Sequence, residues 1–134
     1  ASPDGRKAGL PVSEGISPVQ GADKNGPTSV VKSAAKIEHL HTGGTLLNQK
    51  FSPNFFEDDT AISKVSSLVR SYFRLNGHHI QFNVVSAETL RDAQKHPENY
   101  RNLIVRVAGY SDYFNDLGLD LQNEIIERTE QEGL

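Results

Sequence analysis

Histidines are the residues of this chain that could most directly bind a metal ion, because neutral imidazole is a common metal ligand. The sequence contains five of them, at His39, His41, His78, His79 and His96. On an extended segment His39 and His41 would share one side, whereas the adjacent His78 and His79 would point in opposite directions. No carboxylate follows them at a recognised ligand spacing, so the sequence predicts no metal site.

Two further segments contain some, but not all, of the residues that a catalytic or metal site needs. Ser111 next to Tyr110 offers a hydroxyl nucleophile beside an acid, but the G-x-S-x-G turn that activates such a serine is absent. The segment Asp23-x-Asn25-Gly26 begins like a calcium loop, but Pro27 follows it and the ligand glutamate is missing. The sequence therefore predicts neither a serine nucleophile nor a calcium site.

A short loop near the end of the chain is more informative. It reads Arg106-Val107-Ala108-Gly109-Tyr110-Ser111, and Gly109 lies 25 residues before the last residue (134 − 109 = 25). Glycine has no β-carbon, so its α-carbon can flatten and can be approached closely without a clash. On this motif alone, however, the preferred interpretation is a turn after the strand Leu103–Val107.

Other segments accompany this loop in a fixed order along the whole chain. They are Ser2-Pro3-Asp4-Gly5-Arg6, Gly15-Ile16-Ser17-Pro18, Gly21-Ala22-Asp23-Lys24-Asn25-Gly26-Pro27-Thr28, Gly44-Thr45-Leu46-Leu47-Asn48-Gln49-Lys50-Phe51, Gly77-His78-His79-Ile80-Gln81-Phe82-Asn83-Val84, His96-Pro97-Glu98-Asn99-Tyr100 and Leu121-Gln122-Asn123-Glu124-Ile125-Ile126-Glu127-Arg128-Thr129. Together they resemble the C-terminal part of a glycyl radical enzyme. The resemblance is closer to the eliminating branch, such as glycerol, propanediol and hydroxyproline dehydratases, than to pyruvate formate-lyase.

The resemblance implies that Gly109 stores an unpaired electron on its α-carbon, spread over the flanking amide nitrogen and carbonyl. This radical is a modification installed by an iron–sulfur, S-adenosylmethionine-dependent activating enzyme, so no cofactor is expected on the chain itself. The neighbouring residues Arg106, Val107, Ala108, Tyr110 and Ser111 are expected to support the radical loop. The planar guanidinium of Arg106 could clamp main-chain carbonyls, or it could meet the activating enzyme when the loop is extruded.

The chain contains no cysteine. In the family the glycyl radical takes a hydrogen atom from a cysteine thiol, and the resulting thiyl radical attacks the substrate. Serine cannot replace that thiol, because an O–H bond is too strong to be broken reversibly by a stabilised carbon radical. The chain is therefore expected to hold half of an active site, and its partner is expected to be the cysteine-bearing catalytic portion of a glycyl radical enzyme.

Two classes of function follow from the resemblance. In the first, the chain is the radical-bearing portion of a dehydratase, whether split, cleaved or excised, and water is lost from a diol-like substrate. In the second, it is a stand-alone spare-part protein that restores an oxygen-damaged enzyme. Spare-part proteins usually contain the region from Gly77 onward behind an unrelated leader, so the family-like Ser2–Phe51 favours the first class. The stretches His78–Val85 and Gly109–Asn115 favour diols, although the sequence does not identify the substrate.

Composition excludes several other classes. Fourteen Lys and Arg against 17 Asp and Glu give a net charge of −3, which makes no electrostatic case for nucleic acid or an anionic membrane. No apolar run approaches the length of a membrane span. The resemblance implies a cytoplasmic protein, or one enclosed in a bacterial microcompartment. It is also compatible with a homodimer of the assembled enzyme.

The hydrophobic and turn patterns predict an α/β protein. Residues 1–28 are rich in Pro and Gly, which indicates a long irregular segment. Such a segment is either disordered or draped over a surface that other parts supply, and the resemblance favours the second. After it we expect a helix from Pro27 through Ala35, a strand Thr45–Phe51, a helix Asp58–Leu75, a strand His79–Val85, a helix Glu88–Lys95 capped by Ser86, a strand Asn102–Val107 and a helix Leu119–Glu130. In the helix Asp58–Leu75 the predicted buried stripe consists of Ile62, Val65, Val69, Tyr72 and Phe73.

The resemblance extends this to a ten-stranded α/β barrel, of which the chain would form the C-terminal part. Residues 1–76 would then be late barrel elements and residues 77–134 the glycyl radical domain. The alternating polar side chains His79, Gln81 and Asn83 fit either a barrel interior or a solvent-facing edge strand equally well. The resemblance favours the interior, and it implies that Leu103–Val107 carries Gly109 into a dry cavity.

Overall fold

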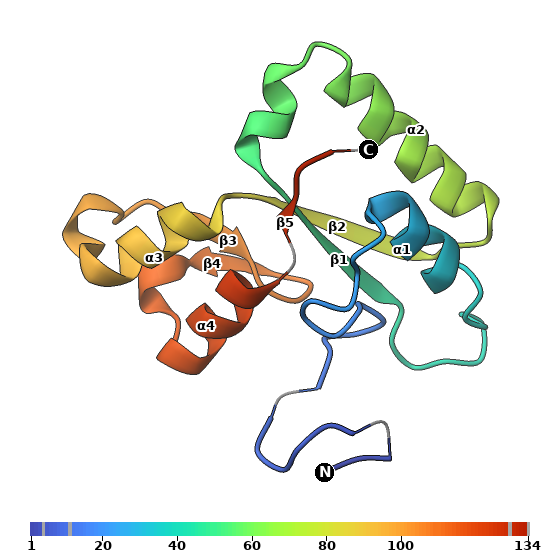
Figure 1. The fold of residues 1–134 in the computed structure, drawn as a ribbon, viewed down its shortest axis with the longest axis horizontal. Coiled ribbons are helices and arrows are strands. Elements are labelled where there is room, and N and C mark those ends of the chain that lie inside the picture. Colours follow the sequence, from blue (N-terminus) through green and yellow to red (C-terminus); the bar gives the residue numbers. More distant parts are fainter. Residues whose placement is uncertain (4, 11, 129, 134) are drawn as a thin grey trace.

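Two hydrophobic cores organise the molecule, which we describe from a computed structural model that covers residues 1–3, 5–10, 12–128 and 130–133. In the first core, two helices pack on two parallel strands: α1 (Pro27–Ala34), α2 (Ala61–Arg74), β1 (Leu46–Phe51) and β2 (His79–Val84). The second core lies between two helices and a β-hairpin: α3 (Ala87–Lys95), α4 (Leu119–Glu127), β3 (Ile104–Arg106) and β4 (Ser111–Tyr113). Figure 1 shows α1 and α2 on one side of the central strands and α3, α4 and the hairpin on the other.

The central sheet has three parallel strands in the order β2-β1-β5, and β5 is the short segment Glu130–Gln131. Its register pairs Leu46 with His79 and Lys50 with Glu130. Because β1 has a strand on both sides and side chains over both faces, five of its six residues are buried. Three of these buried side chains are polar, namely Asn48, Gln49 and Lys50. Short 3₁₀ turns at Pro53–Glu57, Pro97–Asn99 and Phe114–Asp116 complete the described elements.

Several predicted boundaries are confirmed. Helix α1 begins at Pro27, where a missing backbone N–H does no harm. Helix α3 begins after Ser86, whose hydroxyl accepts a hydrogen bond from the Thr89 amide at 3.0 Å, and it ends before Pro97. The predicted strand Asn102–Val107 is shorter, since only Ile104–Arg106 pairs with the other arm of the hairpin.

The predicted buried stripe of α2 is partly wrong. Ile62 is 73% exposed and Phe73 is 49% exposed, whereas Ala61, Leu68 and Tyr72 are buried. Each exposed residue follows a buried one by a single position, which is a rotation of about 100° around the helix axis. The helix therefore turns a narrower face to the sheet than its full set of apolar residues suggests.

The final helix also ends earlier than predicted. It stops at Glu127, and Arg128 already has extended backbone angles (φ −56°, ψ 134°). The chain then runs on into β5, which pairs with Lys50 and Phe51 of β1. The predicted end of this helix at Glu130 is therefore wrong, because residues 130–131 complete the central sheet instead.

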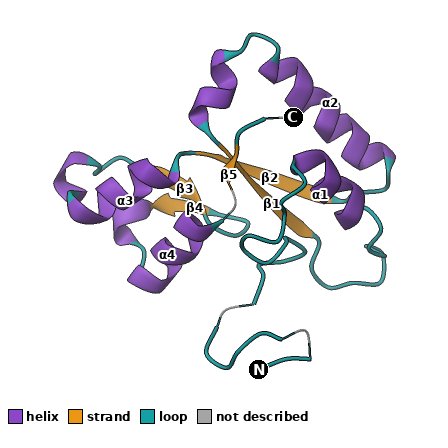
Figure 2. Ribbon diagram, viewed as in Figure 1, coloured by secondary structure: helices purple, strands orange, loops and turns teal. Residues whose placement is uncertain are grey.

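The segment before α1 contains no helix or strand among its described residues, as predicted, and Figure 2 draws it as loop. It still makes defined contacts with β1. The Ile16 amide donates to the Leu46 carbonyl at 2.9 Å, and the Asn48 amide donates to the Ser17 hydroxyl at 2.9 Å. Gly15 has a φ of +54°, and a β-carbon there would overlap the Leu46 carbonyl oxygen, so this close approach requires glycine.

The architecture is mixed α/β, as predicted. Within the described residues the parallel sheet has three strands and does not close into a barrel. The ten-stranded barrel and the division at residue 76 stay predictions from the resemblance.

The turn after α2 offers a test of the first core. A β-carbon on Gly77 would overlap the ring of Tyr72, which is fully buried. We expect Gly77→Ala to lower the free energy of unfolding by about 1–3 kcal/mol, because the ring must move within a packed core. Gly43→Ala is the matched control, since no atom lies within 4 Å of a β-carbon there. Equal denaturation midpoints in urea for the two variants would contradict this packing.

Candidate functional site

The loop Val107–Tyr110 joins the two arms of the β3–β4 hairpin. Arg106 pairs with Ser111 at its base, and the Val107 amide donates to the Tyr110 carbonyl at 2.9 Å. Gly109 has a φ of +74°, in the left-handed region that favours glycine. The turn interpretation of this motif is therefore confirmed, and it does not exclude a chemical role for the same glycine.

The two ends of the loop differ in exposure. Val107 is 3% exposed and packs into the second core, whereas Ala108 and Gly109 are exposed and Tyr110 is 49% exposed. No heavy atom lies within 4 Å of the point where a β-carbon on Gly109 would stand. The dry cavity that the resemblance implies for Gly109 is not formed by the described residues, because a three-stranded sheet cannot enclose the loop.

A row of side-chain amides connects the sheet to this loop. The Oε1 atom of Gln81 accepts hydrogen bonds from Arg106 Nε at 2.8 Å and from the Gly109 amide at 3.3 Å. Gln81 Nε2 donates to Asn48 Oδ1, and Asn48 Nδ2 donates to the Val107 carbonyl at 3.4 Å. Both amide side chains are buried. The backbone on each side of Ala108 is therefore tied to the central strands.

Arg106 is held through both its backbone and its side chain. Its amide donates to Asn83 Oδ1 and its carbonyl accepts from Asn83 Nδ2, both at 2.7 Å. Its guanidinium donates to Gln81 and, through Nη1, to the Ser111 hydroxyl at 3.3 Å. The predicted clamp on main-chain carbonyls is wrong for the described residues, since the guanidinium contacts side chains. Support of a radical loop by Arg106 and its neighbours stays a prediction.

These contacts decide where the polar face of β2 points. Gln81 and Asn83 are buried and face the hairpin, whereas His79 is exposed. Among the described residues, Gln81 and Asn83 of this face contact the hairpin, so they do not form a solvent-facing edge. The position of the face in a barrel interior stays a prediction from the resemblance. Sequence reasoning missed Asn48 and Ser17, although the polar run Asn48-Gln49-Lys50 inside a predicted strand was a usable signal for Asn48.

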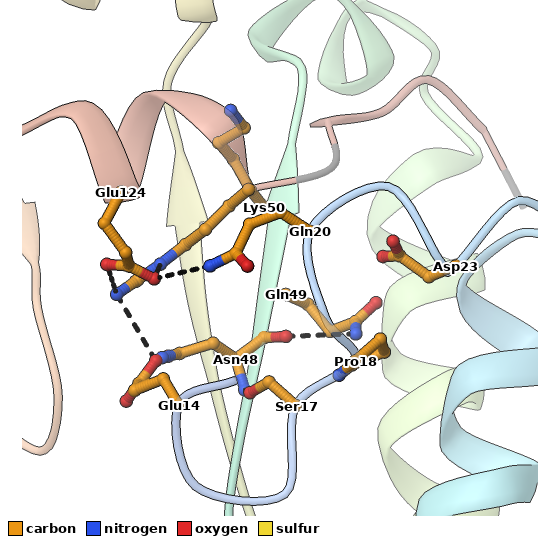
Figure 3. A pocket seen from close by; sticks show the side chains of 10 residues that line it. Glu14, Ser17, Pro18, Gln20, Asp23, Asn48, Gln49, Lys50 and Glu124 are labelled. Carbon is orange, nitrogen blue, oxygen red and sulfur yellow. Dashed lines mark hydrogen bonds and ion pairs between the residues drawn. The ribbon is translucent and has the colours of Figure 1, made fainter. Parts of the chain in front are cut away.

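A second polar cluster, of which Figure 3 labels the members Glu14 and Glu124, forms around Arg128. Its Nη2 atom is 2.8 Å from Glu124 Oε2 and 3.3 Å from Glu14 Oε2, and its Nη1 atom donates to the Arg106 carbonyl at 3.2 Å. These three charged side chains are at most 19% exposed. The cluster therefore joins the N-terminal segment and α4 to the base of the hairpin.

The same cluster borders a small cavity of about 30 Å³. Lys50 contributes to its wall, and the Lys50 ammonium donates to the Ile126 carbonyl at 2.9 Å. Burial lowers the pKa of Lys50, and nearby Glu130 opposes that change. Gln20 completes the wall and donates to Glu124 Oε1 at 3.1 Å. The cavity has room for only a few water molecules, so it is too small for an organic substrate.

The histidines do not assemble a metal site in the described part of the chain. No group of three or more His, Cys, Asp or Glu side chains there has a ligand arrangement. The rings of His39 and His78 lie near each other, with centroids 6.1 Å apart, but two histidines alone do not form such a group. None of the described helices is long and apolar enough to cross a membrane.

Comparison with known proteins gives concordant matches. Residues 12–115 match the family model described as "Glycine radical". The chain is 58% identical over 131 residues to the trans-4-hydroxy-L-proline dehydratase of Clostridioides difficile, covering 98% of the chain and 17% of that protein. It is 51% identical to the probable dehydratase YbiW of Escherichia coli K12, covering 97% of the chain and 16% of that protein.

A solved structure agrees with these sequence matches. The glycerol-bound B12-independent glycerol dehydratase from Clostridium butyricum superposes with a TM-score of 0.94 at 50% identity, covering 98% of this chain and 17% of that one. The chain thus spans about a sixth of the length of the relatives that it matches.

The Arg128 cluster leads to a prediction about pH. Burial raises the pKa of Glu14 above its ordinary value of 4.5; Arg128 lowers it, and Glu124 raises it further. A carboxyl with a raised folded-state pKa contributes stability below pH 4.5, and that contribution is lost as the pH rises through the folded-state pKa. We therefore expect Glu14→Gln to gain thermal stability relative to the parent as the pH rises from 4.5 to 7.5.

Glu124→Gln is the matched comparison, because Glu124 makes two of the contacts of Arg128, at 2.8 and 3.1 Å. Its removal leaves the buried guanidinium with weaker compensation, so this variant should lose stability at neutral pH. Thermal unfolding scans at several pH values distinguish the two carboxylates. A difference between Glu14→Gln and the parent that is constant across pH would contradict the assignment.

Proposed function

The chain belongs to the glycine radical family, and from that premise we propose that Gly109 is the residue that stores the radical. The chain corresponds to the glycine radical portion of dehydratases in that family. Gly109 lies within the matched residues 12–115 and is the glycine at the tip of the β3–β4 hairpin. Arg106, Val107, Ala108, Tyr110 and Ser111 then form the loop that supports it.

One observation carries the proposal. The α-carbon of Gly109 faces open space, while the peptide group before it is held by buried Gln81 through the Gly109 amide, and the Val107 carbonyl one peptide earlier is held by buried Asn48. A stored carbon radical needs both properties, because the hydrogen donor must reach the α-carbon and the flanking amides must hold an orientation that delocalises the electron. Gly15 and Gly77 fail the first requirement, since a β-carbon on either would overlap a neighbour.

The chemistry then requires a thiol from outside this chain, which has no cysteine. The thiol S–H bond breaks, its hydrogen atom forms the new Cα–H bond of Gly109, and the unpaired electron is left on sulfur. The thiyl radical removes a hydrogen atom from the substrate carbon that bears one hydroxyl. The hydroxyl on the neighbouring carbon then leaves as water with the proton of the first hydroxyl, and the first carbon becomes the carbonyl of the aldehyde. The product radical takes the hydrogen atom back from the thiol, and the last transfer restores the radical on Gly109.

The proposed substrate is a small molecule that carries a hydroxyl group, with a diol that yields an aldehyde as the leading case. Hydroxyproline belongs in the same assays, because the identity to the Clostridioides difficile hydroxyproline dehydratase is 58% and the identity to the glycerol dehydratase structure is 50%. The described residues do not choose between these substrates.

We propose two protein partners for this chain. One is the cysteine-bearing portion of a glycyl radical enzyme, with the assembled enzyme a homodimer. The other is an iron–sulfur, S-adenosylmethionine-dependent activating enzyme, which installs the radical without leaving a cofactor on this chain. We assign both to the cytoplasm or to a bacterial microcompartment there.

The first test is spectroscopic. Anaerobic incubation with a suitable activating enzyme, a reductant and S-adenosylmethionine is expected to give a doublet electron paramagnetic resonance signal, since one α-proton remains on the radical carbon. Gly109→Ala should abolish the doublet. This variant should still fold, because there is space for the methyl group and the strain at φ +74° costs only about 1–2 kcal/mol.

Gly43→Ala serves as the control with an unchanged signal, since Gly43 is remote from the hairpin in sequence and also has space for a methyl group. A doublet that persists in Gly109→Ala would move the radical elsewhere. The spare-part alternative is tested separately, by adding the activated chain to an oxygen-cleaved relative and measuring whether dehydration returns without any other added polypeptide.

The second test uses oxygen. Dioxygen adds to a carbon-centred radical, and the resulting peroxyl at the α-carbon breaks the backbone there. Air should therefore separate Tyr110–Leu134 from the rest of the activated chain, and mass spectrometry should detect the two pieces. Chain that was never activated should stay intact, because without the radical Gly109 is an ordinary residue. Cleavage at another position, or equal cleavage without activation, would contradict the assignment.

A further inference from the structure

We propose that Gln81 is a positioning residue that sets the electronic character of the Gly109 radical through the hydrogen bond from the Gly109 amide. This inference rests on the proposed function, in which Gly109 carries the radical. The atom concerned is Gln81 Oε1, and its expected effect is to increase the spin on the Gly109 nitrogen.

The orientation of the Gln81 amide is fixed by its partners. Arg106 Nε and the Gly109 backbone nitrogen are both donors without acceptor capacity, so the atom that meets them must be the carbonyl oxygen, Oε1. The Nε2 group then faces Asn48 Oδ1, which can only accept. All three contacts agree on one orientation, and a flipped amide would lose all of them.

The position of Gln81 is equally constrained. It lies in the middle of β2, paired with Asn48 of the central strand, and it is 7% exposed. Its oxygen is therefore presented to the loop by the sheet rather than by another flexible loop. A hydrogen-bond acceptor on such an element holds its partner more precisely than one on a mobile segment.

The contact acts on the part of Gly109 that shares the unpaired electron. In the radical, the amide nitrogen donates electron density to the α-carbon and the carbonyl withdraws it. An acceptor on the N–H draws the proton away from the nitrogen, so the nitrogen donates more strongly and carries more spin. The same bond limits rotation of the peptide group between Ala108 and Gly109, which keeps the nitrogen orbital aligned with the α-carbon.

Arg106 contributes to this effect indirectly. It donates to the same oxygen at 2.8 Å, whereas the Gly109 amide lies at 3.3 Å. The shorter bond holds Oε1 in place without reaching the radical carbon. In this arrangement Arg106 and Asn48 fix the position of the acceptor, and the electronic effect comes from Gln81 alone.

The experiment compares Gln81→Leu, Gln81→Glu and the parent in the full chain, each labelled with ¹⁵N-glycine and activated anaerobically. Gln81→Leu keeps the approximate size but removes the acceptor, whereas Gln81→Glu keeps an oxygen toward Gly109. We expect a smaller ¹⁵N coupling in Gln81→Leu by electron–nuclear double resonance. Its doublet should also decay about fivefold faster in anaerobic buffer containing a small thiol, the change expected from the loss of one ordinary hydrogen bond. Gln81→Glu should keep at least the parent's ¹⁵N coupling and should not decay faster, because its carboxylate still accepts from the Gly109 amide and from Arg106, although it loses the donor to Asn48.

Gln49→Leu is the matched control, because Gln49 is an equally buried glutamine of the same sheet whose amide contacts the Asn48 carbonyl and not the hairpin. It should leave the coupling and the decay unchanged. If Gln81→Leu does not fold, Gln81→Asn gives the same readout, since its amide ends one carbon short of the loop.

The possible results test the radical assignment to Gly109 and the role of Gln81 separately. A parent chain that gives no doublet overturns the radical assignment and this inference together. A doublet of equal coupling and equal decay in the parent and Gln81→Leu leaves the radical on Gly109 but overturns the role of Gln81. Loss of coupling in Gln81→Leu with retention in Gln81→Glu supports it, because a purely structural role would not follow the acceptor atom.

Discussion

The hydrogen bonds that Gln81 accepts from the hairpin and that Asn48 donates to it are the interactions on which the rest of the structure depends. They are formed by side chains of the central sheet and reach backbone atoms of the loop between the two cores. An ordinary bond of this kind contributes about 1 kcal/mol net, but a buried amide left without its partner costs about 1–3 kcal/mol. Specificity follows from that asymmetry, since any other position of the hairpin would leave these amides unpaired.

The Arg128 cluster also holds the base of the same hairpin. Two carboxylates from distant parts of the chain, Glu14 and Glu124, meet one guanidinium, which also donates to the Arg106 carbonyl. Removing charges from water is costly, so a buried cluster of this kind contributes less to stability than to the choice of one arrangement. Here the arrangement brings the N-terminal segment, the end of α4 and the hairpin to one point. The irregular segment thereby gains a fixed path that its own sequence cannot specify.

Local features of the fold could be predicted from the sequence, because their causes are local. Pro27 opens a helix and Ser86 caps another through contacts within a few residues. The direction of α2 could not be predicted, because which of its apolar residues are buried depends on the sheet beneath it. Strand β5 was missed for a similar reason, since two residues form a strand only when β1 supplies their partners.

The candidate site shows the same division. Alternation identified Gln81 and Asn83 as one face of a strand, but the same pattern fits a cavity wall and a solvent-facing edge. Only the packed structure shows that this face meets the hairpin. Gly109 itself was found through resemblance, because a glycine in a turn has the same local signature whatever its chemistry.

The loop combines a backbone that is hydrogen-bonded to the central strands with an uncovered α-carbon at Gly109. The outer face of the hairpin carries Ile104, Tyr110 and Tyr113, which are 58%, 49% and 43% exposed. Ile104 and Tyr113 pair directly across the two strands, so their side chains form one apolar surface. In the proposed function the described residues align Gly109, and exclusion of water and oxygen is assigned to the cysteine-bearing partner portion.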